Sequence, residues 1–139
     1  MPRWGKIVLG LLAIALAVGL GGYGIYDWVQ DRNNAKAQFI GAAQKLNYPG
    51  KLTVEWGEGA EADYMEIVLK AGVKNCLIEI EAHKNKPASF WLDEVHTPRR
   101  IGGPTEDDVP QAMAAQRRPT YAAAQQHIRD NKRNYDCAA

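Results

Sequence analysis

One uncharged apolar stretch, from Ile7 to Tyr26, constrains this chain more than any other feature. At a rise of about 1.5 Å per residue, a helix of this length crosses the roughly 30 Å hydrocarbon core of a bilayer. The sequence therefore predicts a transmembrane helix over residues 7–26, after a short basic leader over residues 1–6. A cleaved secretory signal is the alternative. The stretch is longer than the usual signal core, however, and no small-x-small cleavage site precedes a polar region.

The charges on either side of this stretch predict how it lies in the membrane. Arg3 and Lys6 precede it, whereas Asp27 and Asp31 follow it. Because basic residues stay on the cytoplasmic side, we expect a cytoplasmic N-terminus, a single pass through the inner membrane and an exported C-terminal part, periplasmic or extracellular. Trp28 falls at the outer membrane–water boundary, where indole rings are favoured.

The exported part has a nearly balanced charge and a length that suits one small domain. Without Arg3 and Lys6, the 17 basic residues of the chain become 15, against 16 acidic residues. Nucleic-acid-binding domains are usually basic on one face, so no nucleic-acid partner is expected. Two arginine pairs are interpreted as solvated loop charges: Arg99-Arg100 and Arg117-Arg118.

The two cysteines, Cys76 and Cys137, both lie on the exported side. In an oxidising compartment, two cysteines have a single intramolecular connectivity, so a Cys76–Cys137 disulfide is predicted. The alternative is a buried free thiol at Cys76 and a frayed tail at Cys137.

The predicted helix continues beyond the membrane as an amphipathic extension over residues 27–48. Its apolar side chains recur at helical spacing and form one stripe. The stripe consists of Trp28, Ala35, Phe39, Ala42, Ala43 and Leu46. Pro49 and Gly50 predict the end of the helix, because proline lacks the backbone donor and glycine permits a turn.

Over residues 51–139, the predicted exported domain, the apolar period first changes from 3.6 to 2, which is typical of strands. Four strands are expected, over residues 51–56, 64–70, 76–83 and 89–95. Short connections favour antiparallel pairing, and the amphipathic helix would cover the apolar face of the sheet. A short helix over Asn75–Asn85 is the alternative for the third strand.

The C-terminal tail is predicted to be helical. Two breaks end the strand region: Thr97-Pro98 and Gly102-Gly103-Pro104. Thr105, followed by acids, resembles a helix start, and that helix would end near Gln116. Thr120 would cap another helix, to about Lys132. The fold class is therefore α+β: a long N-terminal helix packed on a four-stranded antiparallel sheet, with a helical tail closed by the disulfide.

Two groups of acids and histidines lie on the predicted strands: Glu79, Glu81 and His83, and Asp93, Glu94 and His96. The first group shares one strand face and offers carboxylate and imidazole ligands, but it has no recognised metal-site spacing. The second group has no surrounding catalytic motif. A solvated outer face of a sheet is the preferred interpretation, so no catalytic, metal or cofactor site is predicted. Trp91, which faces opposite to Phe90 and Leu92, is the first candidate for an interface.

This architecture resembles that of type IV pilins and pseudopilins. The leader Met1-Pro2-Arg3-Trp4-Gly5 is similar to a prepilin leader, which would place cleavage between Gly5 and Lys6. The strand order, followed by Gly72-Val73-Lys74-Asn75-Cys76, is similar to the type IVb subgroup. Pilins of this family usually carry a glutamate as the fifth mature residue, whereas Gly10 stands there in this chain. The resemblance therefore favours a minor or pilin-like subunit over a bulk filament subunit.

The resemblance implies a function in assembly, in a type IV filament or a type II-like secretion apparatus, with other pilin-like subunits as partners and without catalysis. Four small residues near the end of the membrane helix would let helices approach closely: Gly19, Gly21, Gly22 and Gly24. An ordinary anchor that tolerates a glycine cluster is the alternative. Two other functions stay open. One is a single-pass envelope accessory or scaffold protein in secretion, conjugation or phage lysis, and the other is an anchored enzyme.

Overall fold

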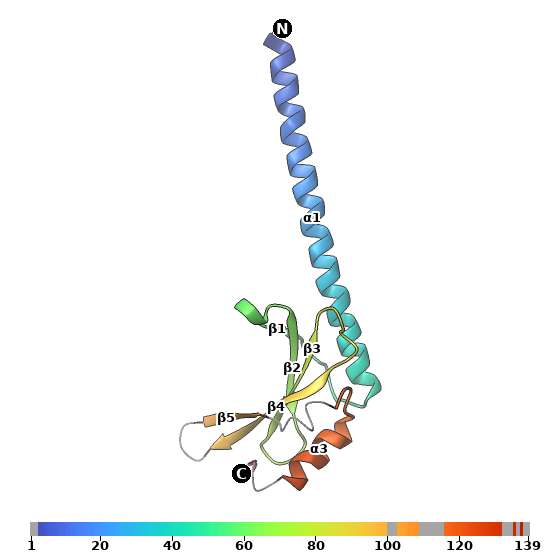
Figure 1. Ribbon diagram of the computed structural model, residues 1–139, viewed down its shortest axis with the longest axis vertical. Helices are drawn as coiled ribbons and strands as arrows, with labels where there is room; N and C mark the ends of the chain where they lie inside the picture. The colour runs from blue at the N-terminus through green and yellow to red at the C-terminus, as the bar shows by residue number, and fades with distance from the viewer. Residues whose placement is uncertain (1–2, 100–102, 109–115, 132–134, 136, 138–139) are drawn as a thin grey trace. The chain divides into compact units, whose positions relative to one another are not determined.

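The computed structural model of the protein describes residues 3–99, 103–108, 116–131, 135 and 137. The chain divides into two compact units, residues 1–34 and 35–139. The helix α1, Arg3–Lys45, begins in the first unit and ends in the second (Figure 1). The second unit also contains an antiparallel sheet, a short 3-10 helix at Gly59–Glu61 and the helix α3, Tyr121–Asp130.

The end of α1 is formed by a left-handed residue, Asn47, with a φ of 65°. Its backbone N–H donates to the Gln44 carbonyl at 3.1 Å. The next N–H, that of Tyr48, donates to the Ala43 carbonyl at 3.2 Å. These two bonds form a Schellman motif, which satisfies the last carbonyls of a helix. The predicted end of the helix is confirmed, and the turn is complete before Pro49.

The sheet is a meander in the order β1-β2-β3-β4-β5, with every neighbouring pair antiparallel. Its strands are β1 Glu55–Trp56, β2 Tyr64–Lys70, β3 Leu77–His83, β4 Trp91–Arg99 and β5 Gly103–Asp108. The α+β class is confirmed, and so is a strand rather than a helix at β3. The first predicted strand, over residues 51–56, is shorter than expected, since β1 covers residues 55–56. Leu52 and Val54 are buried, but they do not pair with β2.

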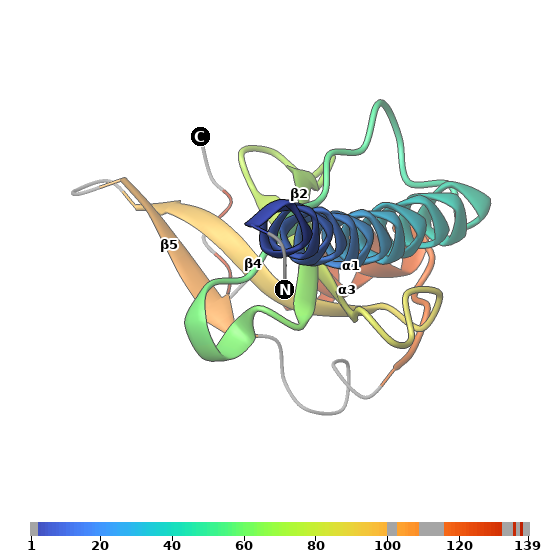
Figure 2. The ribbon, with the colours of Figure 1, turned by 90° about the horizontal axis from the view of Figure 1, so that it is seen from above.

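Two predictions for the segment after Val95 are wrong. β4 does not break at Thr97-Pro98 but continues to Arg99. Residues 105–108, predicted to begin a helix, instead belong to the strand β5, which runs beside β4 (Figure 2). The edge of β4 offers backbone partners along this whole segment, and that tertiary pairing outweighs the local helix-start pattern. Arg100 and residues 109–115 of that predicted helix lie outside the described residues.

One hydrophobic core lies between one face of the sheet and the helical segments of the second unit. The buried apolar side chains of α1 and the sheet are Ala35, Phe39, Ala42, Ala43, Met65, Ile67, Ile78, Ile80, Ala82, Leu92 and Val95. The rings of Phe39 and Phe90 lie 5.9 Å apart and join the helix to the residue just before the strand β4. The predicted apolar stripe is therefore confirmed from Ala35 onward, whereas Trp28, at its start, is 58% exposed.

The C-terminal part closes the core through α3 and the disulfide. Thr120 caps α3 as predicted, because its Oγ1 accepts a hydrogen bond from the Ala123 N–H at 3.1 Å. The Tyr121 N–H donates to the Leu46 carbonyl at 3.1 Å, which ties α3 to the end of α1. The predicted disulfide Cys76–Cys137 is present, and it joins the start of β3 to the tail.

Candidate functional site

The outer face of the sheet, opposite the core, gathers carboxylates and a histidine from three strands. These residues, called here the outer-face cluster, are Glu66, Glu79, Glu81, Asp93, Glu94 and His96. The strand register places Glu66 opposite Glu81, and Glu79 opposite Glu94. Like charges directly opposite each other destabilise a sheet. This face is therefore a candidate site, because stability alone would not favour such pairs.

A bulge in β4 creates the cluster. Leu92 and Val95 are both fully buried on the core face, although their separation of three does not fit a regular strand. The register with β3 shifts by one residue here and leaves Asp93 as the extra residue. A one-residue shift reverses the faces of a strand. Glu94 and His96 consequently lie on the outer face, where regular alternation from Leu92 would have placed them in the core.

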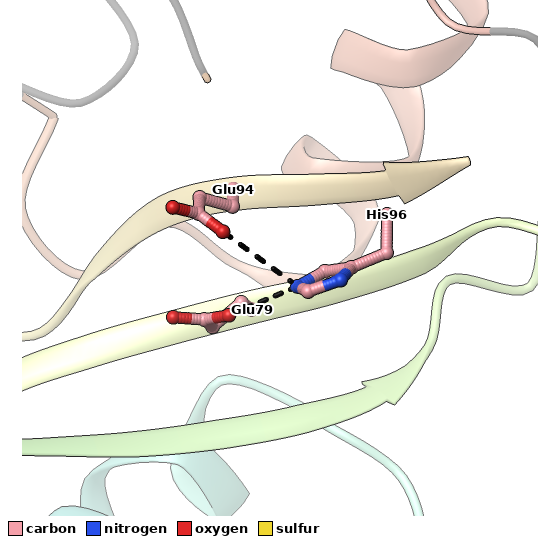
Figure 3. Close-up of side chains that lie close together, drawn as sticks. All are labelled: Glu79, Glu94 and His96. Carbon is pink, nitrogen blue, oxygen red and sulfur yellow. Dashed lines mark hydrogen bonds and ion pairs between the residues drawn. The ribbon is translucent and has the colours of Figure 1, made fainter. Parts of the chain in front are cut away.

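Figure 3 shows the part of the cluster that contains the histidine. The Nε2 atom of His96 lies 2.9 Å from Oε2 of Glu79 and 3.8 Å from Oε2 of Glu94. These side chains are largely shielded from solvent, with exposed fractions of 15%, 9% and 21% respectively. Glu79 also belongs to a second group of carboxylates, with Glu66 and Glu81, whose oxygens lie within 4.8 Å of one another. Carboxylate and imidazole ligands of this kind can hold a divalent metal ion.

Two carboxyl groups of the outer-face cluster, those of Glu81 and Glu66, have a raised pKa. Burial raises the pKa of Glu81 to about 9, with further contributions from a hydrogen bond to Asp93 and from the charges of Asp93, Glu66 and Glu79. Burial also raises the pKa of Glu66, and repulsion by Glu79 acts in the same direction. A proton on Glu81 thus relieves part of the repulsion that the strand register creates.

The acid–histidine groups of the sequence are rearranged in the structure. Glu79 and Glu81 share one face of β3, as expected for alternating residues. The ring of His83 contacts that of Tyr64 at 5.1 Å and is not part of the outer-face cluster. Glu79 instead meets the histidine of the second group, which the sequence analysis treated separately. The register between β3 and β4 brings Glu79 and His96 together. In the sequence, the one feature that indicates this register is the three-residue spacing of Leu92 and Val95.

Trp91 lies at the edge of the outer-face cluster and is partly buried by its neighbours. Its ring is 6.1 Å from that of Tyr64, and the guanidinium of Arg117 lies 4.4 Å from its centroid. Its Nε1 donates a hydrogen bond to Oδ1 of Asp93 at 3.2 Å. Arg117, interpreted from the sequence as a loop charge, therefore makes a specific cation–π contact. The interface role of Trp91 stays a prediction.

Among the described residues, α1 is the helix long and apolar enough to cross a membrane. The large apolar side chains that the structure describes before Asp27 are between 52% and 70% exposed: Ile7, Val8, Leu11, Leu12, Ile14, Leu16, Val18, Tyr23, Ile25 and Tyr26. A Cβ built on Gly19, Gly21, Gly22 or Gly24 would meet nothing within 4 Å. Gly5 and Lys6, the predicted cleavage residues, lie near the start of the same helix. An apolar surface of this extent marks a membrane or interaction site.

Comparison of the chain with models of known protein families, with curated proteins and with solved structures found no match. Its function is therefore inferred from its own residues.

Proposed function

We propose that this chain is a membrane-anchored, pilin-like subunit that acts by assembly, as a minor subunit of a type IV filament or of a type II-like secretion apparatus. One observation carries the proposal: the single helix α1, Arg3–Lys45, serves two environments. Its first part is apolar and exposed, and its last part contributes Phe39 and Ala43 to the core of the sheet domain. Such a helix joins a folded domain to an apolar segment that can exchange lipid for neighbouring subunits.

The exchange of lipid for protein is physically reasonable for this segment. The backbone hydrogen bonds of a helix are satisfied internally, so its side chains decide what covers it. The glycines over residues 19–24 expose backbone on which another helix can pack closely. Van der Waals contacts between helices then replace contacts with lipid.

The charges and the cysteines of the chain support the proposed orientation. The basic leader supports a cytoplasmic N-terminus, with α1 in the inner membrane. The Cys76–Cys137 disulfide supports an oxidising compartment for the sheet domain, in the periplasm or beyond. Cleavage after Gly5 would leave Lys6 as the first residue of the mature subunit.

Single-cysteine cross-linking in membranes tests the proposal. The two native cysteines are paired with each other, so a cysteine introduced between residues 14 and 25 is the only free thiol. We expect oxidation to link chains with helical periodicity, most strongly beside one of the two glycine pairs that each share a helix face, Gly19/Gly22 or Gly21/Gly24. No linked chains at any position, or equal linkage all around the helix, would contradict assembly through α1.

Replacing the glycines by a bulky residue provides a second measurement, with a matched control. Leucine at all four glycines should abolish the cross-link at the strongest position, because the added side chains keep the helices apart. The control places leucine at Ala13, Ala15 and Ala17. It adds bulk to the same helix outside the glycine cluster and should leave the cross-link intact.

A static single-pass anchor is the second candidate, and its function would be that of an envelope accessory or scaffold protein. The lack of any acid from Met1 to Tyr26 favours it, because pilins usually carry a glutamate in this helix. Insertion into the membrane without any cross-link between chains would establish this candidate instead.

A further inference from the structure

We propose that Glu79, Glu94 and His96 form a binding site for a divalent transition-metal ion such as Zn²⁺, on the outer face of the sheet. The proposal is independent of how α1 assembles, because all three residues belong to β3 and β4.

The positions of the donor atoms fit such an ion. Ligand atoms at about 2.1 Å from a tetrahedral Zn²⁺ lie about 3.4 Å from one another. The distances of 2.9 Å and 3.8 Å from Nε2 of His96 to the oxygens of Glu79 and Glu94 bracket that separation. One ligand atom from each of the three residues lies within 4.8 Å of the other two. Small side-chain rotations are therefore enough to bring all three atoms onto one ion.

The donor set selects the class of metal. Carboxylates alone would suit Ca²⁺ or Mg²⁺, which prefer oxygen ligands. The imidazole of His96 shifts the preference to Zn²⁺ and its neighbours in the first transition row. Three protein ligands leave a fourth position for water or for a side chain of a partner subunit.

The opposed carboxylates of the outer face favour the binding of a cation. Glu79 and Glu94 are directly opposed across the two strands, and Glu66 is opposed to Glu81. A divalent ion offsets two of these negative charges. The Glu79 side chain is only 9% exposed, so water screens these charges weakly and the attraction is correspondingly strong.

The bulge in β4 places Glu94 and His96 beside Glu79. Bulges re-aim side chains, and they are common beside functional sites. In this sheet the register shift falls directly beside the Glu79–Glu94 pair. It turns both Glu94 and His96 toward Glu79, and the metal ion would bridge β3 and β4 at the place where their pairing is interrupted.

Calorimetric titration of the full-length protein with ZnCl₂ tests the site. The protein is held in non-ionic detergent and is first freed of metal with EDTA. We expect one Zn²⁺ per wild-type chain, and affinities weaker by about tenfold or more in His96→Gln and in Glu94→Gln. His83→Gln is the matched control, because it removes a histidine of β3 that is not a ligand of the proposed site, and it should bind like the wild type.

Two further measurements keep the test decisive. Titration of the wild type with CaCl₂ should give much weaker binding than ZnCl₂, and equal affinities would reduce the site to a non-selective acidic surface. Nuclear magnetic resonance of the wild-type histidine rings should show one ring, that of His96, shifting on addition of Zn²⁺. No saturable binding, unchanged affinity in both variants, or no shift of the His96 ring would overturn the proposal.

Discussion

Replacing Phe39 by alanine tests whether the last part of α1 belongs to the core of the sheet domain. The Phe39 side chain is fully buried, and its ring lies 5.9 Å from that of Phe90. Truncating a buried phenylalanine to alanine costs about 3–5 kcal/mol, and an aromatic pair is worth about 0.5–1.5 kcal/mol beyond its buried area. We therefore expect the free energy of unfolding to fall by about 4 kcal/mol. That loss is a large part of the roughly 5–15 kcal/mol that stabilises a typical protein.

The assay is urea unfolding of the full-length protein in non-ionic detergent, followed by near-ultraviolet circular dichroism. Gln38→Ala is the matched control, because Gln38 is exposed and directly precedes Phe39 in the helix. Its effect should stay within about 0.5 kcal/mol. A loss below about 1 kcal/mol for Phe39→Ala would refute the assignment of this part of α1 to the core.

Three further stability predictions use the same assay. Replacing Cys76 and Cys137 by serine should cost about 4 kcal/mol, the chain-entropy value for a loop closed between residues 61 apart, and unchanged unfolding would contradict it. Asn47→Ala should cost about 1 kcal/mol and Asn47→Gly should not, because only alanine is strained at a φ of 65°; equal stabilities would contradict the left-handed cap. With EDTA present, the wild type should lose stability as pH rises from 4.5 to about 9, because the folded protein keeps a Glu81 proton that the unfolded chain releases. Glu81→Gln should then be about 2 kcal/mol more stable than the wild type at pH 8. This value is smaller than the full pKa difference implies, because water screens this half-buried group. A difference in stability that does not change with pH would contradict the raised pKa of Glu81.

The helix and the central strands could be predicted from the sequence because their apolar periods are local properties. Phe39 and Ala43 recur at helical spacing, and both are buried. Ile78 and Ile80 alternate with polar residues, and both lie on the core face of β3. The Thr120 cap is equally local, since a single side chain satisfies the backbone of the next turn. Each of these patterns needs no knowledge of the rest of the fold.

The strand β5 could not be predicted in the same way. Residues 103–108 contain glycine, proline and acids, which are all poor strand formers. Their extended conformation depends on pairing with β4, where Thr105 lies opposite Thr97 and Pro104 opposite Pro98. Local sequence carries the helix-start pattern, while the hydrogen bonds that overrule it come from another part of the chain.

The outer-face cluster depends on the same kind of non-local information. Glu79 and His96 are far apart in the sequence, and they meet at 2.9 Å only because of the register between β3 and β4. That register contains a bulge at Asp93, which reverses the faces of the following residues. In the sequence, Glu79 and His96 belong to two separate acid–histidine groups, and regular alternation gives no reason to join them. The arrangement of the metal ligands is therefore seen only in the structure.

The intact mass of the protein, taken both from membranes and from sheared surface material, tests the central claim most directly. The pilin-like account predicts a chain that begins at Lys6 and is present in the sheared fraction. A chain that retains the residues before Lys6 and is found only in membranes would contradict it and leave a static anchor.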